Sequence, residues 1–143
     1  MKNILVAIDL EDNSQIVVEN AAALAEKFAA KIWILHVSDP DPDFVGNAVG
    51  PQYIRDNLAM EIHHEHKLVK QFVDMVKARG IAADGLLIQG VTIEMILAET
   101  EKLQIDLLVL GRHKHNLLYN FFAGSTHTSV VNKSKIPVLV VPI

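Results

Sequence analysis

Short apolar runs alternate along this chain with longer segments in which apolar residues recur every three or four positions. Most of the short runs are rich in β-branched residues, and their apolar positions are consecutive rather than alternating. This pattern predicts strands that are buried on both faces, as in a parallel sheet. The predicted strands cover residues 4–8, 31–37, 86–88, 106–111 and 137–142.

The segments between these runs have the spacing of amphipathic helices. A first helix is expected near residues 14–29, with N-cap candidates at 12–14, and a long helix near 52–79, with Gly80 as its C-cap. The apolar face of the first helix is predicted to contain Ile16, Val17, Ala21, Leu24, Ala25 and Phe28. The buried stripe of the long helix is predicted to contain Leu58, Ile62, Val69, Phe72, Val73 and Val76.

Two further helices and two loops complete the pattern. Thr92 is a candidate N-cap of the third helix, and a fourth helix is expected to start at Ser125. Residues 38–51 hold two Asp-Pro pairs and two glycines, which predicts a long loop. Residues 112–123 are expected to be irregular. The face of the third helix is predicted to contain Ile93, Ile96, Leu97 and Leu103.

The resulting order of elements is β-α-β-α-β-α-β-α-β. Such alternation predicts an α/β protein in which an open five-stranded parallel sheet is covered by helices on both faces. Its crossover connections are expected to be right-handed. No internal repeat or linker divides the chain, so we expect residues 1–143 to form a single domain.

Composition narrows the classes of protein to consider. The chain has 143 residues, no cysteine and a formal net charge of −4, and 50% of its residues are hydrophobic. The absence of cysteine excludes a disulfide framework, a thiolate metal site and a cysteine nucleophile. The acidic balance argues against a nucleic-acid partner, and no apolar stretch approaches the ~20 residues of a membrane span. We expect a cytoplasmic protein.

The fold class by itself points to one edge of the sheet as the ligand site. In open parallel sheets of this kind, ligands bind outside the carboxyl ends of the strands, where the strand order reverses. The first and fourth strands are the expected neighbours at that point. The candidate residues there are Ala7, Ile8 and Asp9 after the first strand, and Leu110 and Gly111 at the end of the fourth.

Residues 111–126 have the composition of a phosphate-binding segment. Gly111 would let another group approach the backbone closely, and Gly124 opens an expected helix whose N-terminus would attract phosphate. Hydroxyl groups follow at Ser125 and Thr126, and cationic or titratable side chains lie at Arg112, His113 and Lys114. A helix cap beside a solvated basic loop would use the same residues, so both interpretations stay open.

Several segments together resemble the universal stress protein family. The start, NILVAIDLEDNSQ, is similar to the family's first strand, which ends in Asp and leads into a Ser-containing helix start. Similar segments follow as LHV at 35–37, QGV at 89–91, IDLLVLG at 105–111 and KIPVLVVP at 135–142. The resemblance covers essentially the whole chain. It implies a Rossmann-like fold, related to the adenine nucleotide alpha hydrolases, with strand order 3-2-1-4-5.

The resemblance also implies roles for individual residues. The nucleotide-binding branch of the family has a glycine, two residues, a second glycine, nine residues, and then glycine with Ser or Thr. Gly111 and the Gly124-Ser125 pair are in register, but Lys114 replaces the second glycine. By resemblance, the phosphates and ribose would be held by Gly111, His113, Gly124, Ser125 and Thr126. Asp9 and its neighbours would contact the nucleoside, and Val37 would present its backbone to adenine.

Lys114 allows two opposite outcomes. A side chain there obstructs the loop if the position requires positive φ or direct contact with phosphate. Alternatively, the ammonium group binds phosphate as a point charge.

Histidines also cluster outside this motif. His63 and His66 share a face of the long helix, and with Glu65 nearby a divalent metal is conceivable. One helix supplies too few ligands for a closed site, so a solvated helix face is favoured and no metal is expected. His36 lies in an apolar strand and is interpreted as a hydrogen-bonded core or strand-end residue.

By resemblance, the chain is a stress-response regulatory protein that binds ATP or AMP, with or without Mg²⁺. A nucleotide-independent dimeric interaction module is the alternative. A slow ATP hydrolase is the second alternative, supported only by Asp9, and no catalytic residue is assigned. The last strand is expected to pair with its twofold copy in a homodimer, which would cover an aggregation-prone edge. That apolar run consists of Val138, Leu139, Val140 and Val141.

Overall fold

The computed structural model describes residues 1–38, 52–112 and 130–143, and within this part of the chain five strands form one sheet. The order is β3-β2-β1-β4-β5, and the four strand pairs are all parallel. The predicted fold class and strand order are therefore confirmed. The strands are β1 (Asn3–Ala7), β2 (Lys31–Ser38), β3 (Ala83–Gln89), β4 (Leu107–Arg112) and β5 (Val138–Pro142).

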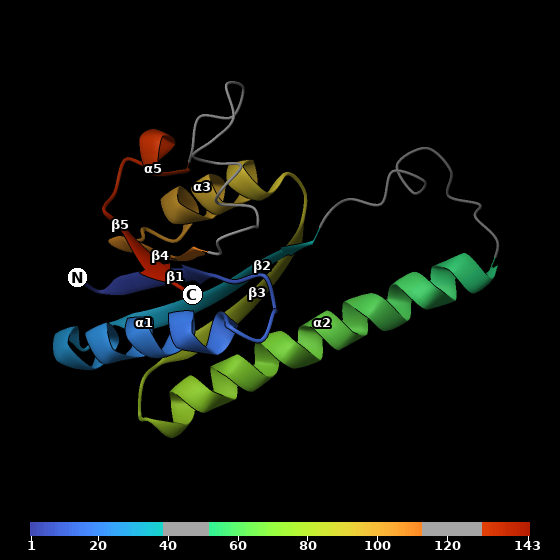
Figure 1. Ribbon diagram of the computed structural model, residues 1–143, viewed down its shortest axis with the longest axis horizontal. Coiled ribbons are helices and arrows are strands. Elements are labelled where there is room, and N and C mark those ends of the chain that lie inside the picture. Colours follow the sequence, from blue (N-terminus) through green and yellow to red (C-terminus); the bar gives the residue numbers. More distant parts are fainter. Residues whose placement is uncertain (39–51, 113–129) are drawn as a thin grey trace.

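Helices cover both faces of the sheet (Figure 1). One face packs against α1 (Ser14–Phe28) and α2 (Gln52–Ala78), and the other against α3 (Thr92–Lys102) and α5 (Val130–Lys133). The three central residues of β1 show why its apolar run is continuous. Ile4 and Val6 belong to the core on the α1 side, whereas Leu5 belongs to the core on the α3 side, and all three are fully buried. Successive side chains of a strand point to opposite faces, and here both faces are covered.

The apolar face of α1 differs from its prediction at both ends. Ile16 and Phe28 are 43% and 52% exposed. Val17, Ala21 and Ala25 are buried as predicted, and Leu24 is half-buried. The face that packs on the sheet is made of small and β-branched side chains, and its buried apolar members are Val17, Val18, Ala21, Ala22 and Ala25.

The long helix α2 is buried mainly in its C-terminal half. Val69, Val73 and Val76 are buried as predicted, whereas Leu58, Ile62 and Phe72 are only half-buried. Leu58 and Ile62 belong to the N-terminal half of α2, which extends past the end of the sheet (Figure 1), whereas Phe72 is partly buried against the core. The sheet therefore contacts mainly the second half of this helix.

Of the two predicted N-caps, the one at Thr92 is wrong and the one within residues 12–14 is confirmed in position. Thr92 is the first residue of α3, and the N-cap position is occupied by Val91, which makes no side-chain capping bond. Asn13, one of the predicted candidates, occupies the N-cap of α1, although its side chain makes no capping bond. The predicted end of α2 is supported by Gly80, whose φ of +78° takes the chain out of the helix.

Several strand boundaries also differ from the predictions. β3 covers seven residues rather than three, because the polar and small residues at its start still pair with β2 in register. Arg112 was expected in an irregular segment, but it is the last residue of β4 and lies opposite Pro142. The expected helix start at Ser125 lies outside the described residues, which resume at Val130 in α5.

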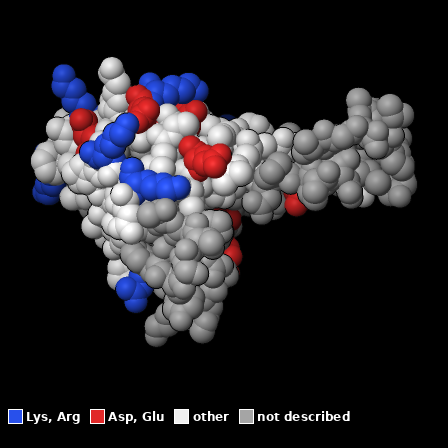
Figure 2. Space-filling model, turned by 90° about the horizontal axis from the view of Figure 1, so that it is seen from above, with Lys and Arg blue, Asp and Glu red and all other residues white. Residues whose placement is uncertain are grey.

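Charged side chains of both signs are mixed on the face that carries α3 and α5 (Figure 2). On α3, Lys102 Nζ lies 3.1 Å from Glu99 Oε1. Lys135 Nζ lies 2.8 Å from Glu101 Oε1 and links α3 to the segment before β5. None of the helices in the described part of the chain is both long enough and apolar enough to span a membrane.

Candidate functional site

The carboxyl ends of β1 and β4 lie side by side, as the fold class predicted. In the parallel ladder Ala7 is directly opposite Leu110. The side chain of Leu110 is buried in the core on the α3 side, and Ile8 is buried in the core on the α1 side. Ala7, Ile8 and Leu110 therefore contribute mainly backbone to this edge of the sheet.

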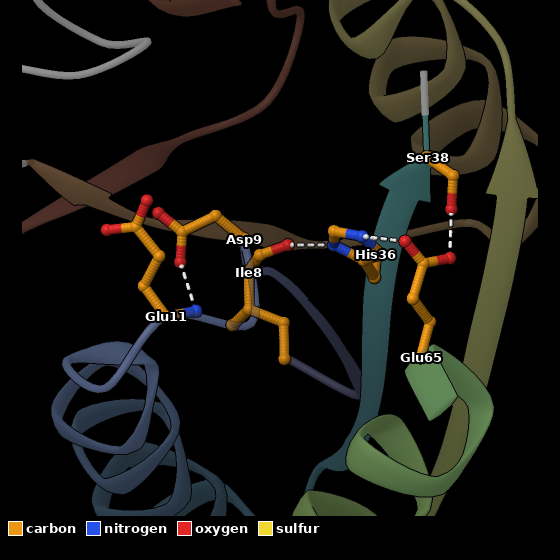
Figure 3. Close-up of polar contacts among 6 residues, drawn as sticks. All are labelled: Ile8, Asp9, Glu11, His36, Ser38 and Glu65. Carbon is orange, nitrogen blue, oxygen red and sulfur yellow. Dashed lines mark hydrogen bonds and ion pairs between the residues drawn. The ribbon is translucent and has the colours of Figure 1, made fainter. Parts of the chain in front are cut away.

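Asp9 organises the turn that connects β1 to α1. Its Oδ1 accepts a 3.0 Å hydrogen bond from the Glu11 N–H, drawn in Figure 3, and a 2.9 Å bond from the Ser14 hydroxyl. The residue between them, Leu10, has φ of +66°, a left-handed conformation that is unfavourable for a branched side chain. Strained residues of this kind persist where the surrounding contacts hold them, often at functional sites. The Asp9 side chain is one of the groups that hold this turn.

Gly111 is closely packed against side chains of the protein itself. A Cβ atom at this position would lie 2.9 Å from Cγ2 of Val17 and 2.7 Å from Cδ1 of Ile143. Both distances are shorter than ordinary carbon contacts. The next residue, Arg112, is exposed, and its carbonyl accepts a 3.1 Å bond from the Ile143 N–H. The chain end after β5 is thus attached beside Gly111.

A polar cluster that the sequence did not reveal links the residue before Asp9 to β2 and α2. His36 Nδ1 is 2.9 Å from the carbonyl oxygen of Ile8, and His36 Nε2 is 3.6 Å from Glu65 Oε1 (Figure 3). The hydroxyl of Ser38 donates a 2.5 Å hydrogen bond to the other Glu65 oxygen. The interpretation of His36 as a hydrogen-bonded residue near a strand end is confirmed. Its two partners lie just after β1 and in α2, far from His36 in the sequence, and no local pattern could have identified them.

Val37 lies between His36 and Ser38, and its side chain packs on the α3 side of the sheet. The side chains before and after it point to the α2 side, where both are bonded. The backbone of Val37 is thus anchored on each side. The remaining predicted site residues, His113, Lys114, Gly124, Ser125 and Thr126, lie outside the described residues.

The histidines of α2 lie away from this edge. His63 and His66 line a groove of about 470 Å³ between α2 and the edge strand β3. Lys67 and Lys70 line the same groove, and its other lining residues are Val69, Val73, Gly85 and Leu87. Within residues 1–38, 52–112 and 130–143 no group of three or more His, Asp or Glu side chains is arranged to hold a metal ion. Whether His63 and His66 stay metal-free in solution remains a prediction.

Proteins of one known family are similar to this chain over nearly its whole length. The model of the universal stress protein family matches residues 1–142. Universal stress protein A homolog 1 of Coxiella burnetii is 33% identical over 141 residues, which cover 98% of this chain and 95% of that protein. A universal stress protein of Thermus aquaticus is 28% identical over 98% of both chains.

Solved structures of the same family have the same fold. A universal stress protein in complex with cAMP superposes with a TM-score of 0.72 at 20% identity, covering 98% of this chain and 96% of the other. A family member from Arabidopsis thaliana with AMP bound gives 0.68 at 17% identity, covering 99% and 92%. One from Archaeoglobus fulgidus in complex with dAMP gives 0.67 at 17% identity, covering 98% and 97%. At these identities the likeness establishes the fold.

Proposed function

The chain belongs to the universal stress protein family, and we propose that it binds an adenine nucleotide at the carboxyl ends of β1 and β4. The observation that carries this proposal is the adjacency of the Ala7 and Leu110 backbones at the point where the strand order reverses. Three relatives of the same fold were solved with cAMP, AMP or dAMP, which supports an adenine nucleotide as the ligand class.

The nucleoside would lie against the turn after β1 and the end of β2. Ala7 and Ile8 would offer backbone, Asp9 would contact the nucleoside, and the Val37 backbone would face adenine. The end of β4, with Gly111 and Arg112, leads toward the segment that would hold the phosphates. In that segment the proposed ligands are His113, Lys114, Gly124, Ser125 and Thr126.

Magnesium would accompany ATP mainly through the phosphates. Mg²⁺ in nucleotide sites is usually held by one or two carboxylates together with phosphate oxygens and water. Asp9 is the carboxylate closest in sequence to the strand end, and one of its oxygens already accepts two hydrogen bonds within its own turn. A single carboxylate of this kind fits a metal ion that is held mainly by the phosphates of the nucleotide.

The functional role we propose is stress-response regulation, in which nucleotide occupancy alters contacts with partners. A nucleotide-independent interaction module is the second candidate. It is favoured by one specific observation, because the close contact of Gly111 with Val17 and Ile143 explains that glycine without any ligand. The replacement of the middle glycine of the motif by Lys114 also favours the nucleotide-independent module.

Mass spectrometry of small molecules released from the purified protein separates these two candidates. Copurified ATP, AMP or a related adenine nucleotide supports nucleotide binding. Calorimetry with ATP, AMP and adenosine then measures the contribution of the phosphates. No binding to the wild type at millimolar ATP would assign the chain to the nucleotide-independent branch. A hydrolase would in addition need sustained phosphate release that Asp9→Asn abolishes while the protein stays folded.

Lys114→Gly distinguishes the two possible effects of the lysine. If Lys114 contacts phosphate, the variant binds ATP more weakly, and adenosine binding changes less. If Lys114 obstructs the loop, the variant binds ATP more tightly. We expect weaker binding, because a long side chain can bring its ammonium group to phosphate. A phosphate contact also predicts that ATP affinity falls as salt concentration rises.

A further inference from the structure

A polar chain connects the proposed nucleotide edge to the long helix. It runs from the Ile8 carbonyl after β1, through His36 and Ser38 of β2, to the carboxylate of Glu65 on α2 (Figure 3). The side chains of His36 and Glu65 are only 12% and 19% exposed. Interactions between partly buried polar groups are screened less by solvent than surface pairs are. These groups therefore connect the residue after β1, strand β2 and helix α2.

The partners of each group determine which atoms donate and which accept in this polar cluster. A carbonyl oxygen can only accept, so His36 Nδ1 donates its hydrogen to Ile8. His36 Nε2 faces a carboxylate oxygen of Glu65, and Ser38 donates to the other oxygen. The Ser38 hydroxyl supplies the hydrogen bond to Glu65, whereas His36 Nε2 lies 3.6 Å from the other carboxylate oxygen, beyond hydrogen-bond length. Glu65 thus contacts two side chains of β2, one of which also bonds to the Ile8 carbonyl.

Two backbone positions of the proposed nucleoside site are next to these groups. Asp9 directly follows Ile8, and Val37 lies between the two bonded residues of β2. The His36 bond therefore adds to the backbone pairing that holds the Asp9 turn beside the strand of Val37. A nucleoside held by both positions would stabilise the same geometry that the Glu65 contact requires.

Glu65 also occupies a distinctive place along α2. After it the helix is buried on the sheet through Val69, Val73 and Val76. Glu65 is at the midpoint of α2 (Gln52–Ala78), and the N-terminal half of this helix extends past the sheet (Figure 1). The contact with His36 lies where the supported half of α2 meets the extended half. A change in this contact would therefore alter how firmly the extended half is held.

We propose that the contact between Glu65 and His36 couples the docking of α2 to occupancy of the nucleotide site. This inference rests on the proposed function, because it concerns the regulation of the same site. Bound nucleotide strengthens the hold on α2 near Glu65, and by linkage a firmly docked α2 raises nucleotide affinity. His36 and Glu65 act here as positioning residues. The extended half of α2 becomes the surface that changes with nucleotide occupancy.

Glu65→Gln tests the coupling with little change in shape, and Glu61→Gln is the matched control. Glu61 is one turn earlier on α2, is exposed, and loses the same charge in its variant. AMP affinity is measured by calorimetry, and amide hydrogen exchange is followed over residues 58–68 with and without AMP. We expect AMP to slow exchange there in the wild type and in Glu61→Gln. In Glu65→Gln we expect this protection to disappear and AMP affinity to fall about fivefold or more.

A double-mutant cycle with His36→Gln identifies the pair as the source of the effect. If the two residues act together, the double variant binds AMP no more weakly than the worse single variant. The ring ¹⁵N signals of His36 provide a readout that general destabilisation would not reproduce. We expect these signals to differ between the wild type and Glu65→Gln, because the variant changes the group that faces His36 Nε2. Additive losses with unchanged ring signals would overturn the proposal.

Two outcomes separate this proposal from the proposed function. If the wild type binds AMP, and Glu65→Gln matches it in affinity and exchange, the coupling is refuted while nucleotide binding stands. If the wild type binds no AMP, the proposed function fails. Amide hydrogen exchange is then compared without ligand at Ile8 and Glu11, whose N–H groups donate to the Leu35 carbonyl and the Asp9 carboxylate. Faster exchange at both amides and in α2 of Glu65→Gln would still support the link between the elements. Unchanged exchange would refute it.

Discussion

Gly111 and Val17 approach each other so closely that the glycine cannot carry a side chain without movement of the structure. A Cβ on Gly111 would lie 2.9 Å from Val17 Cγ2, on the helix that covers this face of the sheet. The sequence suggested a ligand as the reason for this glycine. The structure supplies a second reason, which is the packing of α1 and of Ile143 against the end of β4.

Gly111→Ala is therefore expected to destabilise the fold by about 1–3 kcal/mol, the usual cost of overpacking a tight site. Denaturant unfolding measures this change. Val17→Ala in the same chain should recover part of the loss, because it removes the Val17 methyl group that would lie 2.9 Å from the new Cβ. Wild-type stability with loss of nucleotide binding alone would show instead that this glycine serves only the ligand.

The homodimer remains a prediction, and the structure indicates which residue should test it. β5 pairs with β4 and is a terminal strand of the described sheet. Val141 is buried in the core, so a charge there would unfold the protein, whereas Val140 is only half-buried. We expect light scattering to give twice the monomer mass for the wild type and the monomer mass for Val140→Lys. Gln89→Lys on the other terminal strand is the control and should stay dimeric. A wild-type monomer at micromolar concentration would contradict the prediction.

Metal removal is expected to leave the stability unchanged. His63 and His66 come from one helix and line an open groove with two lysines, which disfavour a bound cation. Chelator should therefore not shift Tm, and the double variant His63→Ala, His66→Ala should melt in the same way with or without zinc. A drop in Tm on chelation that zinc restores, and that the double variant lacks, would establish a metal site.

The amino end of the sheet provides a pH-dependent contribution to stability. Backbone N–H groups of Lys2 and Asn3 donate to Asp106 Oδ2 at 2.5 and 3.0 Å, and these bonds lower the pKa of Asp106 below its ordinary value of 3.8. Because the pKa is lower in the folded state, the contribution is fully present above about pH 4 and is lost as pH falls through the lowered value. Asp106→Asn should melt below the wild type at pH 7, and the difference should shrink in acid. The exposed Asp12→Asn serves as control, and a difference independent of pH would contradict the assignment.

Much of the architecture was predictable because burial leaves a local pattern. Residues 4–8 are apolar at consecutive positions, and the structure buries β1 on both faces. The position of Asp9 and Gly111 at neighbouring strand ends followed from strand order alone. Helix faces were less predictable, since Ile16 and Phe28 fit the helical spacing but lie at the margin of the contact with the sheet.

The sequence by itself determined the alternation of strands and helices, the family resemblance and the edge of the sheet where a ligand is expected. These features depend on residue type and on spacing over a few turns, which a linear pattern contains. Only the tertiary structure decided that His36 contacts Ile8 and Glu65, and that Gly111 packs against Val17 and Ile143. The partners in these contacts are far apart in the chain and come from different elements. They meet because the sheet order and the path of α2 across the sheet bring them together, and that geometry depends on the packing of the whole core.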